Sequence, residues 1–242
     1  MLPLSLLLLA ACSPGTEADA PPEVATYSII ARDSETGEIG VAVQSKFIAV
    51  GAVVPFAKAG VGAVATQAYA NVGYGPRALR LLADGASPGD VVTILTRDDP
   101  KAARRQFGVL TAEGEAATYT GDRCFGWAGG KIGKDCVAQG NILAGEAVVT
   151  ALVDSFHSSA GSGKALAERL IDALEAAEEA GGDRRGKQSA ALLVVREGWG
   201  YDGGNDRFRD LRVDEHRTPI AELRRIYAAH RKLFPRPDEE RE

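Results

Sequence analysis

The sequence predicts an α+β protein in which two antiparallel sheets pack together and helices cover both outer faces, a four-layer αββα sandwich. Two observations predict this fold. Short β-rich segments follow one another with only turns between them, which favours antiparallel hairpins. Segments with helical periodicity lie between these groups of strands, mostly in pairs. Because each helix must bury its apolar stripe against another layer, the helices are expected outside the sheets.

The first predicted hairpin joins strands over residues 26–32 and 39–45 through a turn at Gly37. Residues 49–67 are predicted to form two further short strands, whose many Ala and Gly residues favour close packing of another layer. A pair of helices is expected next, over residues 73–85 and 87–99. Each helix has a proline suited to its first turn, and Ser87 is a plausible cap for the second.

Strands and helices alternate in the same way through the second half. The segments FGVLTAEG and EAATYTGD are expected to pair through a turn at Glu113-Gly114. The remaining predicted elements are a strand over 135–143, helices over 145–159 and 163–182, strands over 188–198 and 208–216, and a helix over 218–234. One domain is therefore predicted over residues 26–234, followed by a disordered tail over 235–242.

Composition sets limits on the function. The chain has 242 residues, of which 45% are apolar and 25% are charged, as in ordinary soluble globular proteins. The net charge is −5, and no basic stripe is interleaved with aromatic residues. Nucleic acid is therefore not expected as a partner.

The chain begins with an apolar run, MLPLSLLLLAAC, which predicts a secretory signal over residues 1–11. The run is too short for a transmembrane helix, which needs roughly twenty residues. Its end resembles a bacterial lipobox, which implies lipid attachment to Cys12 and therefore a membrane anchor; the alternative is an uncleaved apolar tail. Residues 12–25 contain Pro, Gly, Ala and acids without periodicity, which predicts a flexible tether. The expected location is the bacterial cell envelope, in the periplasm or on the outer surface.

Two further cysteines, Cys124 and Cys136, flank the glycine-rich segment FGWAGGKIGKD. In an oxidising compartment these two thiols could form a disulfide. The alternative is two thiols on strands that never meet. Neither cysteine has a CxxC partner or a nearby histidine, so no metal site is expected, and no cofactor motif is complete.

Four long segments carry a family resemblance: TYSIIARDSETGEIGVAVQSKFIAVGAVVPFAKAGVGAVATQ, WAGGKIGKDCVAQGNILAGEAVV, GGDRRGKQSAALLVV and DLRVDEHRTPIAELRRI. Together they resemble the bacterial and archaeal family known as domain of unknown function 1028, over residues 26–234. The resemblance implies the fold of the N-terminal-nucleophile hydrolases, which include proteasome subunits and often form homo-oligomers. Some family members carry a peptidoglycan-binding domain, which makes cell-wall peptides or small amides candidate substrates.

The resemblance also implies a set of catalytic residues. Thr26 would attack an amide through its hydroxyl, with its own α-amine as the base. That amine has an ordinary pKa near 8, suited to accept a proton at neutral pH. Lys58, or alternatively Lys46, would supply a positive charge. Asn141 would present an amide to the oxyanion, and Asp183 would orient the amine or the hydroxyl.

Four further residues are candidates for binding: Trp127, Arg184, Gln188 and Ser189. Each candidate has a simpler alternative, because a threonine can start a strand for its β-propensity and polar residues are common in turns. The mechanism also requires removal of residue 25, whereas the predicted mature terminus at Cys12 lies fourteen positions earlier. If that second cleavage does not occur, the expected protein is a catalytically silent binding or scaffolding module.

Overall fold

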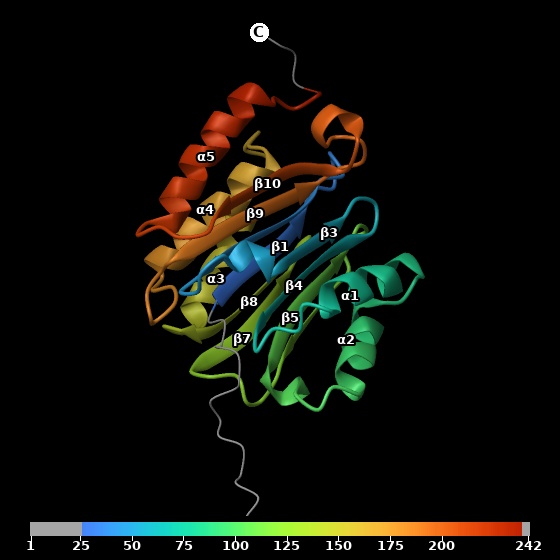
Figure 1. The fold of residues 1–242 in the computed structure, drawn as a ribbon, viewed down its shortest axis with the longest axis vertical. Coiled ribbons are helices and arrows are strands. Elements are labelled where there is room, and N and C mark those ends of the chain that lie inside the picture. Colours follow the sequence, from blue (N-terminus) through green and yellow to red (C-terminus); the bar gives the residue numbers. More distant parts are fainter. Residues whose placement is uncertain (1–25, 239–242) are drawn as a thin grey trace, which may run out of the picture.

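The computed structural model describes residues 26–238 and shows two antiparallel sheets with helices on their outer faces (Figure 1). The predicted signal, the tether with Cys12 and residues 239–242 lie outside the described residues. Within residues 26–238, no helix has the length and apolar character required to cross a bilayer.

The larger sheet has six strands in the order β10-β9-β2-β1-β8-β7, all antiparallel to their neighbours. β1 therefore has a hydrogen-bonded strand on each side. The strands are β1 (Thr26–Arg32), β2 (Ile39–Ser45), β7 (Trp127–Gly133), β8 (Cys136–Leu143), β9 (Ser189–Val195) and β10 (Arg207–Val213). The helices on its outer face are α3 (Glu146–Ser158), α4 (Leu166–Glu179) and α5 (Pro219–Leu233).

The smaller sheet has four strands in the order β3-β4-β5-β6. They are β3 (Pro55–Lys58), β4 (Gly62–Ala68), β5 (Arg105–Thr111) and β6 (Ala116–Thr120), and they are covered by α1 (Tyr74–Ala83) and α2 (Pro88–Arg97). The predicted cap of α2 is confirmed, because the Ser87 hydroxyl accepts a hydrogen bond from Asp90 N at 3.1 Å. Short 3₁₀ helices in the described part of the chain are η2 (Val50–Ala52), η3 (Ala102–Arg104) and η4 (Tyr201–Gly203).

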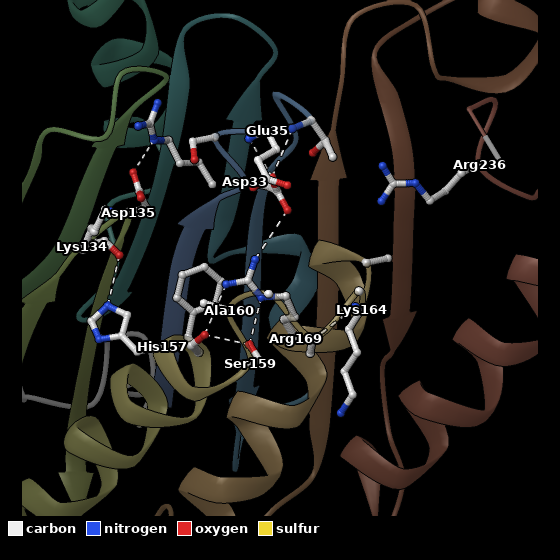
Figure 2. A pocket seen from close by; sticks show the side chains of 18 of the residues that line it. Asp33, Glu35, Lys134, Asp135, His157, Ser159, Ala160, Lys164, Arg169 and Arg236 are labelled. Carbon is white, nitrogen blue, oxygen red and sulfur yellow. Dashed lines mark hydrogen bonds and ion pairs between the residues drawn. The ribbon is translucent and has the colours of Figure 1, made fainter.

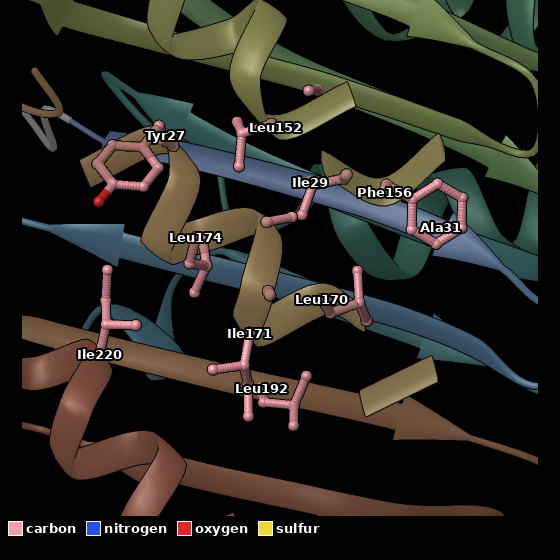
Figure 3. Packing of buried hydrophobic residues seen from close by; sticks show 14 of the residues in the cluster. Tyr27, Ile29, Ala31, Leu152, Phe156, Leu170, Ile171, Leu174, Leu192 and Ile220 are labelled. Atoms are coloured by element: carbon pink, nitrogen blue, oxygen red, sulfur yellow. The ribbon is translucent and has the colours of Figure 1, made fainter. Parts of the chain in front are cut away.

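Three apolar cores lie between these four layers. Alternate residues of β1 point to opposite faces of the sheet, so Ile29 and Ala31 face α3 and α4 (Figure 3). Ile30 instead joins the core between the two sheets. The third core lies between the smaller sheet and its helices, where the rings of Tyr74 and Phe107 pack edge to face at 5.1 Å. The predicted arrangement of two antiparallel sheets with outer helices is therefore confirmed.

The predicted disulfide is wrong, because the segment between the cysteines forms strand β7 rather than a loop. Cys136 follows the turn where β7 ends opposite it at Gly133, whereas Cys124 lies before the start of β7 at Trp127. At about 3.3 Å per residue, the seven-residue strand holds the two thiols roughly 20 Å apart. They are not bonded to each other.

The predicted disordered tail begins too early in the chain. Residues 235–238 belong to the described structure, and the Arg236 side chain is only 11% exposed. Its guanidinium lies 3.0 Å from the buried carboxylate of Glu38, which follows the turn between β1 and β2. This contact fastens the chain beyond α5 to the larger sheet.

Candidate functional site

Four polar residues form a row across one end of the larger sheet: Asn141, Thr26, Ser45 and Ser189, which we call the terminal row. They lie directly opposite one another on β8, β1, β2 and β9, and each is at most 1% exposed. Opposite residues on neighbouring strands share one face, and this face is the one that Ile30 presents to the second sheet. The Thr26 hydroxyl donates a hydrogen bond to Ser45 Oγ at 3.1 Å.

Two glutamines from the smaller sheet meet the terminal row. Gln67 of β4 donates from Nε2 to the Thr26 carbonyl at 3.3 Å and to Gln106 Oε1 at 2.9 Å. Gln106 of β5 accepts from Asn141 Nδ2 at 3.0 Å and donates to the Gly140 carbonyl at 2.7 Å. Asn141 therefore points into the layer between the sheets, where it holds the two sheets together. We did not predict either glutamine, although a glutamine inside an otherwise apolar strand is a signal of a buried polar contact.

Asp183 lies beside the terminal row, on the loop between α4 and β9. Its carboxylate is buried and accepts hydrogen bonds from Lys46 N at 3.0 Å and Arg185 N at 2.9 Å. The Arg185 guanidinium lies 3.2 Å from the same carboxylate and donates to the Lys46 carbonyl at 3.1 Å. The structure thus gives Asp183 a definite role: it fixes the chain where β2 ends, one residue beyond Ser45.

The predicted lysine position, Lys58, is at the wrong end of the sandwich. Lys58 pairs with Gly62 at the start of β4, whereas the Thr26 carbonyl is bound by Gln67, near the end of the same strand. Five residues of extended strand separate these points by about 16 Å. Lys46, the alternative, directly follows Ser45 and is exposed. Because Ser45 pairs with Thr26, the backbone of Lys46 lies nearer to Thr26 than that of Lys58 does.

The other predicted binding residues support the site rather than line a cavity. Ser189 donates to the Phe47 carbonyl at 2.5 Å and accepts from Val50 N at 3.1 Å, which holds the loop after β2. The backbone N–H of Gln188 donates to the Ser45 carbonyl, and the backbone N–H of Arg184 donates to the Ile142 carbonyl. Trp127 begins β7 opposite Leu143 and packs on the core beneath α3.

Tyr27 lies one residue from Thr26 on the opposite face of β1. Burial raises the pKa of its phenol well above the ordinary 10.0, and the nearby carboxylates of Glu178 and Asp183 raise it further. The phenol is therefore neutral at physiological pH. Its oxygen is buried, and no hydrogen-bond partner lies within residues 26–238.

Two hollows open at the other end of the larger sheet. One, of about 740 Å³, is lined by the β1–β2 turn, the β7–β8 turn and the α3–α4 loop (Figure 2). In it Arg169 reaches Asp33 at 3.5 Å, and His157 contacts the Lys134 carbonyl at 3.1 Å. The other, of about 620 Å³, lies between the β9–β10 turn and the end of α5. Neither hollow is lined by a residue of the terminal row.

Within residues 26–238, no three side chains of the His, Cys, Asp or Glu types are grouped closely enough to hold an ion.

Comparisons with known proteins give a family but no activity. No curated protein matches the sequence. A crystal structure of protein SPO2555 from Silicibacter pomeroyi, described as a DUF1028 protein, is similar with 32% identity and a TM-score of 0.77. The match covers 86% of this chain and 89% of that one. The model of the "Family of unknown function (DUF1028)" matches residues 26–223, so the chain belongs to the DUF1028 family.

Proposed function

We propose that this protein is an amide hydrolase of the N-terminal-nucleophile type, with Thr26 as its nucleophile. The observation that carries the proposal is the position of Thr26. It is the first residue of a central strand, its side chain faces the layer between two sheets, and its hydroxyl contacts Ser45 at 3.1 Å. A four-layer sandwich with a threonine at this place suits a hydroxyl activated by its own α-amine.

The reaction begins only after the bond between residues 25 and 26 has been cleaved. The freed α-amine takes the proton of Thr26 Oγ1 while that oxygen attacks the carbonyl carbon of the substrate amide. The tetrahedral adduct then expels the amine product, which takes the proton from the α-ammonium, and an ester remains on Thr26. Water, deprotonated by the same amine, hydrolyses this ester to the acid and restores Oγ1.

The residues around Thr26 have different supporting roles in this mechanism. Lys46, one residue beyond the Ser45 that pairs with Thr26, is the lysine proposed to supply positive charge, which would favour the neutral α-amine and stabilise an oxyanion. Asp183 and Ser189 act as positioning residues, because their hydrogen bonds hold the chain on both sides of Lys46. Gln67 fixes the Thr26 carbonyl from the second sheet. The substrates proposed are cell-wall peptides or small amides at the envelope, where Cys12 anchors the uncleaved chain and cleavage after residue 25 releases the active domain.

The test compares two chains that differ only at the amino terminus. One starts Met-Thr26, so that removal of methionine exposes Thr26, and the other retains residues 12–25. One sample of each chain is treated with a β-lactone, which acylates an N-terminal threonine, and a separate untreated sample is assayed on acyl 4-nitroanilides. Acylation at Thr26 in the first chain alone, lost in Thr26→Ala, is expected. The hydrolase proposal fails if the exposed threonine remains unmodified and no nitroaniline is released.

The second candidate function is ligand binding without catalysis. It is favoured by one observation, that both hollows lie at the end of the sheet opposite Thr26. Terminal sequencing of the native envelope form distinguishes the two candidates. A hydrolase must yield some chains beginning at Thr26, whereas a binding module anchored at Cys12 retains its lipid-bearing terminus.

A further inference from the structure

The hollow between the β9–β10 turn and the end of α5 is lined by exposed apolar side chains, two of them aromatic. Tyr201, Leu233 and Phe234 line it and are 78%, 76% and 40% exposed, respectively. In Figure 1 this turn is the orange loop beside the end of α5. Large apolar side chains are rarely gathered on a surface without a binding role. The volume of about 620 Å³ is also in the usual range for small-molecule sites.

The ring geometry limits what can bind. Trp199 and Phe208 meet at 80°, and Tyr201 and Phe234 at 70°. One face of Trp199 is covered by the Arg196 guanidinium at 3.7 Å, and one face of Phe208 by Arg209 at 3.6 Å. Neither pair offers parallel faces that could sandwich a flat base. The inclined rings of Tyr201 and Phe234 instead provide separate platforms for a puckered ring.

The charges that line this hollow cancel, with two arginines and two aspartates. Arg207 is paired with Asp210 at 2.8 Å, and Arg236 is paired with Glu38. These pairs leave Asp202 as the lining carboxylate without an ion-pair partner among the described residues, and a carboxylate can accept hydrogen bonds from the hydroxyls of a neutral ligand. The hollow therefore fits a ligand recognised by stacking and hydrogen bonds.

The lining of the hollow includes a hydrogen-bond acceptor and a hydrogen-bond donor. Asp202, at the tip of the turn, forms no ion pair within the described residues and adopts a left-handed backbone, with φ of 54°. The His230 ring accepts at Nδ1 from Arg209 at 3.1 Å, which leaves its proton on Nε2 as a donor. Burial and the Arg209 charge lower the pKa of His230, which keeps the ring neutral.

We propose that this hollow binds a neutral saccharide. A pyranose presents C–H groups from one face, which stack on an aromatic ring, and hydroxyls from its edge, which both donate and accept. Tyr201 and Phe234 match the face, and Asp202 and His230 match the edge. The site is separate from the terminal row, so it does not depend on the hydrolase proposal.

Trp199 reports binding directly, because the chain has only two tryptophans and the other, Trp127, lies at the opposite end of the sheet. In a Trp127→Phe background, the full chain is titrated with cellotriose, chitotriose and maltotriose up to about 10 mM while fluorescence is recorded. We expect saturable binding of at least one trisaccharide. Tyr201→Ala should weaken it about tenfold by removing one stacking platform. Tyr201 is exposed, so the substitution leaves the fold intact.

The matched control is Phe125→Ala, which removes an aromatic ring that is 55% exposed and follows Cys124, far from this hollow. It should change the affinity less than twofold, and Thr26→Ala should leave it unchanged. The proposal is overturned if none of the trisaccharides saturates, if adenosine binds in their place, or if Tyr201→Ala has no effect. Size exclusion supplies a further check, because a dimer dispersed by Tyr201→Ala would identify the surface as a contact between copies.

Discussion

Replacing Asp183 with asparagine tests whether its carboxylate holds the end of β2 beside Thr26. Each carboxylate oxygen accepts one backbone N–H: Oδ2 from Lys46 and Oδ1 from Arg185. Asparagine has a single carbonyl oxygen, and its amide group must face one of these two donors in either orientation. One buried N–H therefore loses its partner, which costs about 1–3 kcal/mol of unfolding free energy.

The assay is urea unfolding followed by circular dichroism, with linear extrapolation to water. With a slope of about 2 kcal/mol/M, the expected loss lowers the midpoint by roughly 0.5–1.5 M. Hydrogen exchange at the Lys46 backbone amide should also accelerate in Asp183→Asn, because the hydrogen bond from that N–H to the side chain of residue 183 is weakened or lost. Asp183→Asn should therefore both lower the urea midpoint of the whole domain and speed hydrogen exchange locally at Lys46.

Arg185→Gln is the matched control. The arginine side chain is 36% exposed and the Asp183 carboxylate is buried; because water can replace the half-exposed guanidinium and the carboxylate keeps its two backbone donors, the variant should cost about 1 kcal/mol. Both backbone donors keep their carboxylate in this variant. The reasoning is refuted if Asp183→Asn unfolds at the wild-type midpoint, or if Arg185→Gln costs as much stability as Asp183→Asn.

Three further predictions concern the fold. Gly75→Ala should cost about 1–3 kcal/mol in the same unfolding assay, because the new Cβ would lie 2.2 Å from the ring of Phe56. Asp99→Asn should cost about 3–5 kcal/mol at neutral pH, because it leaves the buried Arg105 guanidinium without its charge partner. Burial favours a higher pKa for Asp99, but hydrogen bonds from Arg105 and Tyr74 outweigh the effect of burial and hold the pKa well below the ordinary 3.8. The Asp99 carboxylate therefore contributes its full stabilisation of the wild-type fold above pH 3.8, and this stabilisation should be lost as the pH falls below 3.8. Cys136 should resist alkylation in the native protein, because burial raises the pKa of its thiol to about 12, and mass spectrometry after unfolding without reductant should find it fully modified.

The sequence predicted most of the elements because their signals are local. Ser87 and Pro88 fix the start of α2 through a capping bond that involves only neighbouring residues. The strand β7 lacked such a signal, since its glycines lower the β-propensity. Gly130 shows why they are there: a Cβ at this position would lie 2.4 Å from the Thr118 hydroxyl of β6. Glycine lets the two sheets approach, and that requirement depends on a residue of the other sheet.

The residues of the candidate site likewise include some whose positions the sequence predicted and some whose positions it did not. Thr26, Asn141 and Asp183 come together as expected, because Thr26 begins β1, Asn141 lies opposite it on β8, and Asp183 forms a bridge with Leu143 at the end of β8. Lys58 does not join them, because its place depends on how far β3 runs before it turns into β4. Gln67 likewise meets Thr26 only through the packing of one sheet on the other. Contacts within a sheet could be anticipated from strand order, whereas contacts between sheets could not.

The side chains in the layer between the sheets change from apolar to polar toward the Thr26 end of the larger sheet, and stability alone does not account for this change. Two rows in from Thr26, the residues that share its face are Ile30, Val41, Val137 and Leu193, all apolar. Continuing that pattern to the end of the sheet would bury more apolar surface. The terminal row instead buries hydroxyls and amides, which rarely add net stability, because each must lose water before it gains a partner. The Gln139 Oε1 atom, one row in, has no hydrogen-bond partner at all within residues 26–238. A polar network with such a cost fixes positions, and the position it fixes is the end of β1. That is the requirement of a site at which one hydroxyl must be held in place, and it supports Thr26 as the reacting group.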